Sequence, residues 1–299
     1  ARYREHAGLL ARLPGRAPLD STAVLSAPSR VSAAFRPFAS RADALALAAR
    51  RRPALASRAT AARAGDSFAE LGLDPELVAA TDALGLVTPT EIQASAIPQI
   101  ASGGNFLVAS HTGSGKTLTY LLPVIQRMRR EEQQSGTRAK PKRPRVLIVG
   151  PTRELVEQVR GVAKALSHHA RFSSELVIGG DKFATQRRQL DRPLDVVVGT
   201  PGRLIKHMEE GNLFMSAVTH VVLDEADTLF EAGFGEEIKR LLRPLRKPHF
   251  DGQTRKSAVV VSATMSKKVV EMMREELEDL VILDTPSLRK SAPNLKHRF

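Results

Sequence analysis

From Asp66 onward, short apolar runs alternate with stretches of helical periodicity. The runs are rich in β-branched residues, as is usual for strands that are covered on both faces. This alternation predicts an α/β fold in which helices flank a mainly parallel sheet. Seven strands are predicted, at 106–109, 146–149, 176–178, 196–198, 218–223, 259–261 and 281–283. The polar segment 131–145 contains glycine and proline, and it is predicted to be a surface loop.

The first 65 residues lack this pattern. They contain twelve arginines, no lysine and three acidic residues, and prolines interrupt them repeatedly. Segments rich in Ala, Arg and Ser and poor in acids are typical of organellar transit peptides, so 1–65 is predicted to be a targeting segment outside the fold. A basic amphipathic helix fits 41–52. A disordered arm and an arginine-rich RNA-binding arm remain alternatives.

Charge and composition narrow the function classes. The net charge is +13, of which the first 65 residues carry +9, so the remainder is only mildly basic. Because the chain has no cysteine, disulfides and thiolate metal sites are excluded. No apolar run approaches the roughly 20 residues that a membrane-spanning helix needs, so no membrane association is predicted.

The strand at 106–109 runs into a glycine-rich turn and then into a helical pattern, which indicates a phosphate-binding loop. Gly113 and Gly115 let the backbone curl so that its N–H groups face an anion. Lys116 supplies a positive charge for the β and γ phosphates, and Thr117 offers a hydroxyl to Mg²⁺. The strict loop pattern starts with glycine, where this chain has serine. The predicted nucleotide-binding residues of the loop are Ser110, His111, Thr112, Gly113, Ser114, Gly115, Lys116 and Thr117.

An acidic run follows another predicted strand, in the sequence His220-Val-Val-Leu-Asp-Glu-Ala-Asp227. A nucleoside triphosphatase needs a carboxylate at the end of a strand beside its phosphate loop, to hold the metal. Asp224 is predicted to be the Mg²⁺ ligand together with Thr117. Glu225 is predicted to orient and deprotonate the attacking water.

The phosphate loop followed by Asp-Glu-Ala-Asp resembles the DEAD-box RNA helicase family. The resemblance covers roughly 66–299 and implies a RecA-like lobe that binds ATP and Mg²⁺. It also implies an adenine-reading segment at 85–93, in which Gln93 hydrogen-bonds the base edge and Phe68 stacks on the base. An amide suits adenine because it offers a donor and an acceptor in one plane. Leu86 stands where family members often have phenylalanine.

Three further segments, each after a predicted strand, resemble the family segments that grip the RNA backbone. Hydroxyls, arginines and N–H groups at helix starts suit phosphate contacts, which carry no base information. The implied RNA-binding residues are Pro151, Thr152, Arg153, Gly179, Gly180, Thr200, Pro201, Gly202 and Arg203. Their order along the chain favours RNA as the partner.

The sequence Ser262-Ala-Thr264 resembles the family motif that ties nucleotide hydrolysis to strand separation, which implies hydrogen bonds to Asp227. A serine at 262 or 266 also suits the N-cap of the next helix. The predicted catalytic residues are Lys116, Asp224, Glu225, Asp227, Ser262 and Thr264. In the family a second RecA-like lobe completes the hydrolysis site. The tail resembles the start of the linker to it, so the chain is divided into 1–65, 66–290 and 291–299, without the second lobe.

Segments 110–117, 167–172 and 207–212 are similar to a plant and algal organellar branch of the family. That branch is associated with ribosomal RNA maturation in the chloroplast. The resemblance therefore implies structured organellar ribosomal RNA as the partner and the chloroplast as the location. The mitochondrion is the alternative, because the transit segments of the two organelles overlap in composition.

Two other function classes remain open. One is a catalytically inactive RNA-binding scaffold, which the intact Lys116, Asp224 and Glu225 disfavour. The other is a DNA-directed helicase or a different P-loop ATPase, which Asp227 and the adenine-reading pair disfavour. An ATPase assay with competing RNA and DNA separates the three classes.

Overall fold

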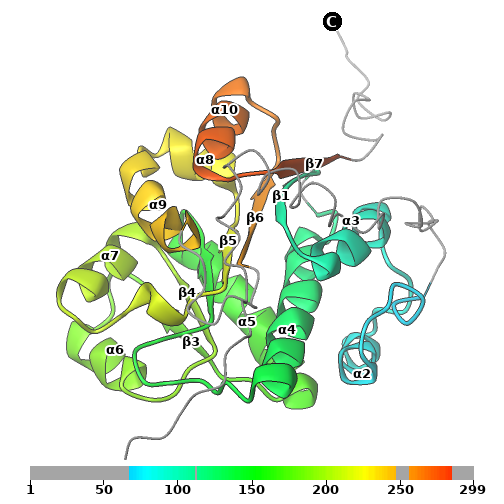
Figure 1. Cartoon of the computed structure of the whole chain (residues 1–299), viewed down its shortest axis with the longest axis horizontal. Coiled ribbons are helices and arrows are strands. Elements are labelled where there is room, and N and C mark those ends of the chain that lie inside the picture. The colour runs from blue at the N-terminus through cyan, green and yellow to red at the C-terminus, as the bar shows by residue number, and fades with distance from the viewer. Residues whose placement is uncertain (1–66, 112, 247–255, 285–299) are drawn as a thin grey trace, which may run out of the picture. The chain divides into compact units, whose positions relative to one another are not determined.

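The computed structural model of the chain describes residues 67–246, except 112, and 256–284. These residues form one parallel sheet of seven strands in the order β3-β4-β2-β5-β6-β1-β7 (Figure 1). The strands are β1 (Asn105–Ala109), β2 (Val146–Val149), β3 (Ser174–Val177), β4 (Val196–Gly199), β5 (His220–Leu223), β6 (Ser257–Ser262) and β7 (Leu280–Asp284). All seven predicted strands are present, although β3 and β6 begin two residues earlier than predicted and β5 two residues later.

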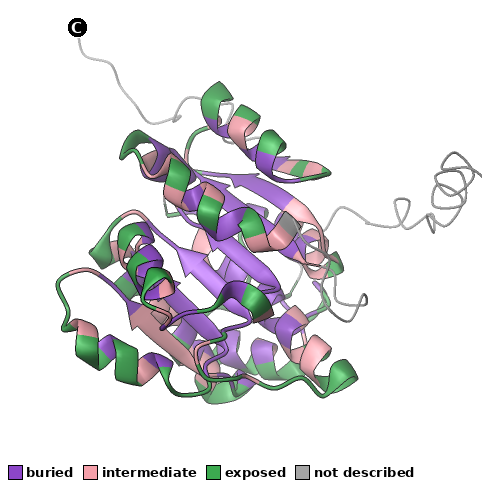
Figure 2. Ribbon diagram, turned by 60° about the vertical axis from the view of Figure 1, so that its left-hand side comes forward, coloured by how far each residue is buried: buried purple, intermediate pink, exposed green. Residues whose placement is uncertain are grey.

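Helices cover both faces of the sheet, because successive strand residues point to opposite faces and feed two apolar clusters. One helix layer contains α2 (Pro75–Ala83), α3 (Glu91–Ser102), α4 (Lys116–Ser135) and α5 (Arg153–Ala170). The other layer contains α6 (Phe183–Leu190), α7 (Pro201–Glu209), α8 (Ala226–Glu231), α9 (Gly235–Leu242) and α10 (Lys267–Glu276). Two 3₁₀ turns, η1 (Met215–Ala217) and η2 (Arg243–Arg246), complete the described elements. Buried residues concentrate on the strands between the layers (Figure 2), which confirms the predicted fold class.

The parallel strands bring all their carboxyl ends to one edge of the sheet. The turns after β1, β2, β4, β5 and β6 lead from this edge into α4, α5, α7, α8 and α10. Local capping fixes several of these helix starts. The hydroxyl of Thr152 accepts a hydrogen bond from Leu155 N, and that of Ser266 accepts one from Val269 N. An N-cap of this kind stabilises a helix by about 1 kcal/mol.

The prediction of a loop over 131–145 was wrong for its first five residues, because α4 continues to Ser135. Burial against the sheet stabilises this last turn. The carboxylate of Glu131 lies 3.3 Å from Nε2 of His220, and that of Glu132 lies 3.1 Å from the Arg145 guanidinium. Arg145 directly precedes β2 and His220 begins β5, so the helix end is paired rather than solvated.

Several predictions fall outside the described residues. They are the targeting segment and its amphipathic helix, the linker at 291–299, and Thr112 of the phosphate loop. These stay predictions. Among the described helices, none has both the length and the apolar character that crossing a bilayer requires.

Candidate functional site

The phosphate loop connects β1 to α4, and its backbone takes the predicted curled form. Gly113 and Gly115 have φ angles of 78° and 87°, which side chains with a Cβ rarely adopt. Ser110, where the strict pattern has glycine, is wholly buried, and its N–H donates to Ser262 O at 3.2 Å. The side chain of His111 is exposed. The loop is therefore anchored to β6 at its first residue and opens toward the start of α4.

Gln93 joins the adenine-reading segment to this loop. Its Oε1 accepts from Thr90 N at 2.9 Å, and its Nε2 donates to Gly115 O at 3.1 Å. Thr90 adds a hydroxyl donation to Ser114 O at 2.8 Å. A Cβ on Gly115 would lie 2.5 Å from Gln93 Nε2, so only glycine permits this approach. The side chain of Gln93 is buried, and it holds the loop from the side.

Phe68 does not present a free ring face. It is 2% exposed and packs in the apolar cluster of the α2 to α5 layer. The stacking role that the resemblance gave to Phe68 requires a ring face in contact with the base. In this structure the ring stabilises the core beside the site, and the stacking role stays a prediction.

The predicted metal ligand lies at the end of β5. The side chain of Asp224 is 4% exposed, and its N–H donates to Val149 O at 2.8 Å. Burial raises the pKa of Asp224, while hydrogen bonds from Tyr120 and from the Glu225 N–H lower it. Glu225 adopts a left-handed backbone, φ 49°, where the chain turns sharply into α8. Strained positions of this kind are common at functional sites.

Lys116 lies between the loop and the carboxylates. Its Nζ donates to Ser110 O at 2.7 Å. Burial lowers the pKa of Lys116, and the nearby Asp224 opposes that shift. Within the described ranges, no group of three or more His, Asp or Glu side chains forms a complete metal cage. The donor set of Asp224 and Thr117 nevertheless fits Mg²⁺, which binds one or two carboxylates and completes its shell with phosphates and water.

The motif after β6 is bonded to Asp227, as the sequence resemblance implied. Oδ2 of Asp227 accepts from Thr264 N at 3.0 Å, from Thr264 Oγ1 at 3.0 Å and from Ala263 N at 3.2 Å. Ser262 orients this turn, because its Oγ donates to Thr264 O at 2.6 Å. Burial would raise the pKa of Asp227, but the hydrogen bonds from Thr264 and Ser262 lower it overall. The turns after β5 and β6 are thereby joined.

The predicted RNA-binding residues also come together. They follow β2, β3 and β4, which are neighbours in the order β3-β4-β2. Asp181 contacts arginines from two of these turns: its carboxylate lies 3.7 Å from Arg153, and its carbonyl accepts from Arg203 at 3.2 Å. Gly180 has a φ of 88°, which residues with a Cβ rarely adopt, so glycine is needed here too. Pro151, Thr152, Gly179 and Thr200 occupy the same turns, and Pro201 and Gly202 begin α7.

The sequence model of one family, DEAD/DEAH box helicase, matches residues 90–273, which is more than half of the chain. The chain belongs to this family. Within it, the chain is 45% identical over 235 residues to "DEAD-box ATP-dependent RNA helicase 39" of Arabidopsis thaliana, covering 78% of this chain and 38% of that protein. It is 34% identical over 232 residues to "ATP-dependent RNA helicase RhlB" of Shewanella frigidimarina, covering 78% and 52%.

A solved structure of a DEAD box protein from Methanococcus jannaschii superposes with a TM-score of 0.62 at 26% identity. The superposition covers 73% of this chain and 55% of that one. The chain thus spans about one quarter to one half of the length of the curated DEAD-box relatives it matches.

The sequence missed three contributors to this DEAD-box site. Tyr120 is wholly buried and hydrogen-bonds Asp224, although its place four residues after Lys116, on the same face of the helix, was a usable signal. Asp181 lies next to the Gly179–Gly180 pair, but only the fold shows that it faces two arginines. Gln186 is buried and accepts hydrogen bonds from Arg203 and His207, a role that nothing in its local sequence indicates.

Proposed function

We propose that this chain is the ATP-binding lobe of an ATP-dependent RNA helicase, in which hydrolysis of ATP is coupled to RNA binding and duplex separation. The observation that carries this proposal is the contact between Asp227 and Thr264. Asp227 follows β5. This strand pairs on one side with β2, which leads to predicted RNA-binding residues, and on the other side with β6, beside the phosphate loop. We infer that this contact couples the RNA-binding half of the edge to the nucleotide-binding half.

The side chains divide the chemistry among them. The loop N–H groups and Lys116 bind the phosphates, and Asp224 with Thr117 holds Mg²⁺. Mg²⁺, when bound, neutralises the charge that develops on the phosphate oxygens. Glu225 accepts the proton of the attacking water, whose oxygen bonds to the γ phosphorus as the bond to the β–γ bridging oxygen breaks.

Since the curated relatives are roughly two to four times as long as the matched region, the proposal includes a second lobe that completes the site. The test uses the full-length protein and measures ATP hydrolysis without RNA, with single-stranded RNA and with duplex RNA. We expect RNA to stimulate turnover, Lys116→Ala to abolish it, and Glu225→Gln to lower it by at least about 100-fold while ATP still binds.

The same assay separates the alternatives. A folded protein that binds RNA but hydrolyses no ATP would be the inactive scaffold. Stimulation by single-stranded DNA equal to that by RNA, with DNA competing for the same site, would identify a DNA-directed enzyme. RNA-specific stimulation excludes both.

The proposed substrate is a structured organellar ribosomal RNA, and the proposed location is the chloroplast, with the mitochondrion as the alternative. The acid-poor, arginine-rich composition of 1–65 supports an organellar address, and the segments at 110–117, 167–172 and 207–212 support the branch. A fluorescent protein carrying residues 1–65 should enter the chloroplast. Crosslinking in the organelle should then recover ribosomal RNA above messenger RNA.

A further inference from the structure

Three segments meet at the amino edge of the sheet, opposite the edge that carries the phosphate loop. They lead into β4, β2 and β5, which are neighbours in the sheet, and they bring Arg192, the turn 140–143 and Phe214 together. Pro141 forms an isolated antiparallel bridge with Pro193, and Phe214 N donates to Lys142 O at 2.8 Å. We call this the amino-edge basic surface: Lys140, Lys142, Arg143, Arg192 and Phe214.

The turn within it is fixed in an unfavourable conformation. Arg143 N donates to Lys140 O at 3.2 Å, which closes a four-residue turn with Pro141 and Lys142 at its centre. Lys142 has a φ of 60°, at the position of a type II turn that normally takes glycine or asparagine. Its N–H is held by Leu190 O at 2.8 Å. The turn is therefore held in this conformation by its hydrogen bonds and by the Pro141–Pro193 bridge.

An aromatic ring completes the surface. Phe214 is 39% exposed, which is unusual for a phenylalanine, and the Arg143 guanidinium lies 4.8 Å from its ring centre. The cation supports one side of the ring and leaves a π-stacking platform with positive charge beside it. Aromatic rings flanked by cations are what unpaired bases and their phosphates require.

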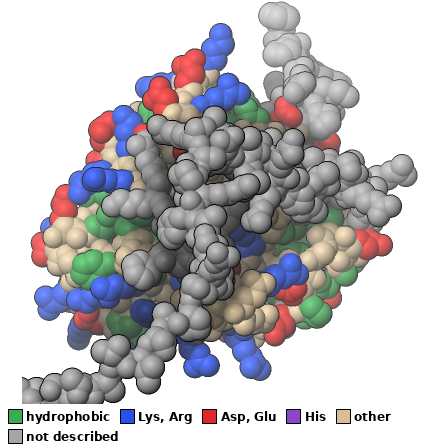
Figure 3. All heavy atoms as spheres, viewed as in Figure 1, with side chains coloured by type: hydrophobic (Ala, Val, Ile, Leu, Met, Phe, Trp, Pro, Cys, Tyr) green, Lys and Arg blue, Asp and Glu red, His purple; other side chains and the backbone are tan. Residues whose placement is uncertain are grey.

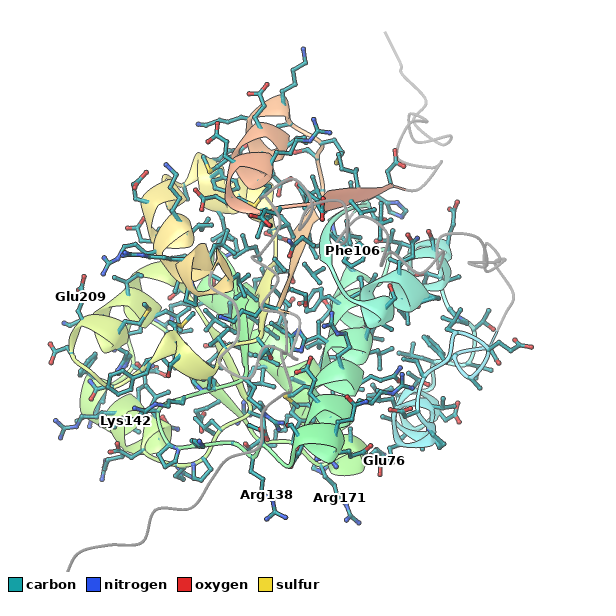
Figure 4. The ribbon with its side chains drawn as sticks, in the orientation of Figure 1. Glu76, Phe106, Arg138, Lys142, Arg171 and Glu209 are labelled. Atoms are coloured by element: carbon teal, nitrogen blue, oxygen red, sulfur yellow. The ribbon has the colours of Figure 1, made fainter. Side chains whose placement is uncertain are left out.

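The surface is strongly basic within a domain that is only mildly so. Asp191 is an acidic neighbour of its four cations, and the Asp191 carboxylate lies 3.2 Å from Lys142 Nζ. Lys140, Arg143 and Arg192 are exposed. Lys and Arg side chains gather along the lower left margin of the molecule (Figure 3), where the stick view places Lys142 (Figure 4).

We propose that the amino-edge basic surface is a second RNA contact, which binds the phosphates and unpaired bases of a segment that flanks the strand gripped at the carboxyl edge. This inference rests on the proposed helicase function. Because the two edges lie on opposite sides of the sheet, a short single strand cannot occupy both, whereas a structured RNA with flanking arms can. An acidic protein is the other partner that the charge would admit.

The test compares two RNAs on the full-length protein. The short one is a single strand of about 8 nucleotides, and the long one joins that strand to a hairpin of about 20 base pairs with an unpaired loop. The variants are Lys140→Gln with Arg192→Gln, which removes two phosphate contacts, and Phe214→Leu, which keeps the charges but removes the ring. The matched control, Lys268→Gln with Arg274→Gln, removes two exposed cations from α10.

We expect the double variant to lose about three- to tenfold in affinity for the long RNA, with its salt slope reduced by about 2. Phe214→Leu should lose about fivefold with an unchanged slope. Neither variant should change binding of the short RNA, and the control should match the wild type. Equal long-RNA affinity in all four proteins would overturn the proposal and leave the surface to an acidic protein. Failure of the wild type to bind the short RNA would instead count against the helicase function itself.

Discussion

The hydroxyl of Tyr120 donates a 2.7 Å hydrogen bond to Oδ2 of Asp224, and both side chains are buried. The other carboxylate oxygen accepts from Glu225 N at 3.0 Å. Burial, together with the neighbouring Asp224, raises the pKa of Tyr120 well above its usual value, so the phenol stays a donor. The carboxylate of Asp224 is thus oriented before any metal arrives.

Replacing Tyr120 with Phe should weaken Mg²⁺ binding and slow ATP hydrolysis by about tenfold, since a hydrogen bond to a charged group is worth about 1.5–3 kcal/mol. The Mg²⁺ concentration for half-maximal rate should rise. The acid limb of the pH–rate profile should also move to higher pH, because the Tyr120 bond lowers the pKa of Asp224 against the effect of burial.

A matched control is Thr119→Val, which removes another buried hydroxyl from α4. That hydroxyl donates to Gly115 O at 3.2 Å and does not touch Asp224. The control should keep the wild-type Mg²⁺ dependence. If Tyr120→Phe kept it as well, the phenol would have no part in positioning the metal ligand.

Thr264→Val should slow RNA unwinding more than it slows ATP hydrolysis. It removes one of the donors to Asp227 and should destabilise the domain by about 1 kcal/mol at neutral pH. Because the folded-state pKa of Asp227 lies below its ordinary value of 3.8, the stability it contributes is present above pH 3.8 and is lost as the pH falls through the folded value. The stability difference between wild type and variant, measured by urea unfolding, should therefore shrink below pH 3.8. A difference that persists there, or unwinding at the wild-type rate, would contradict this role.

Much of the fold followed from the sequence, because buried parallel strands are continuous apolar runs and leave an unambiguous signal. The helix layers and the shared carboxyl edge then followed from the connections. The end of α4 could not be predicted from the sequence, because Glu131 is held there by His220. This contact spans 89 residues, and no local pattern displays it.

The site was predicted where its chemistry depends on backbone form and missed where it depends on distant contacts. Gly115 and Lys116 belong to a loop whose spacing dictates its geometry. The buried state of Gln93 and the donor role of Tyr120 depend on segments that come together only in the folded sheet. Asp227 was predicted through the family resemblance, and its bonds to Thr264 are present.

Arg171→Gly should stabilise the domain by about 0.5–1 kcal/mol. Arg171 ends α5 in a left-handed conformation, φ 49°, and its N–H donates to Ser167 O, which is the geometry that glycine adopts without strain. Its side chain is exposed and points away from the fold (Figure 4). Thermal unfolding of the two proteins checks this, with Arg171→Ala as the control that removes the side chain but keeps the strain. Equal effects of Gly and Ala would show that the backbone is not the cause.

The fall of stability in mild acid should depend on His207. Its ring stacks on Phe183 at 4.1 Å, and Nε2 lies 3.1 Å from Gln186 Oε1. Burial, helped by Arg203 and Lys206, lowers the pKa of His207 from 6.5 to about 4.

Since the unfolded chain takes up the proton first as the pH falls, the stability that the neutral ring contributes is full above pH 6.5 and is lost progressively toward pH 4. His207→Gln should flatten this decline in urea unfolding between pH 7 and about 4.5. Burial also lowers the pKa of His220, which contributes a decline of the same sign, so the flattening should be partial. His169→Gln, at an exposed position of α5, is the matched control and should keep the wild-type slope. A slope in His207→Gln as steep as in the control would mean that folding does not lower the pKa of the ring, and that its contact with Gln186 does not depend on the neutral form.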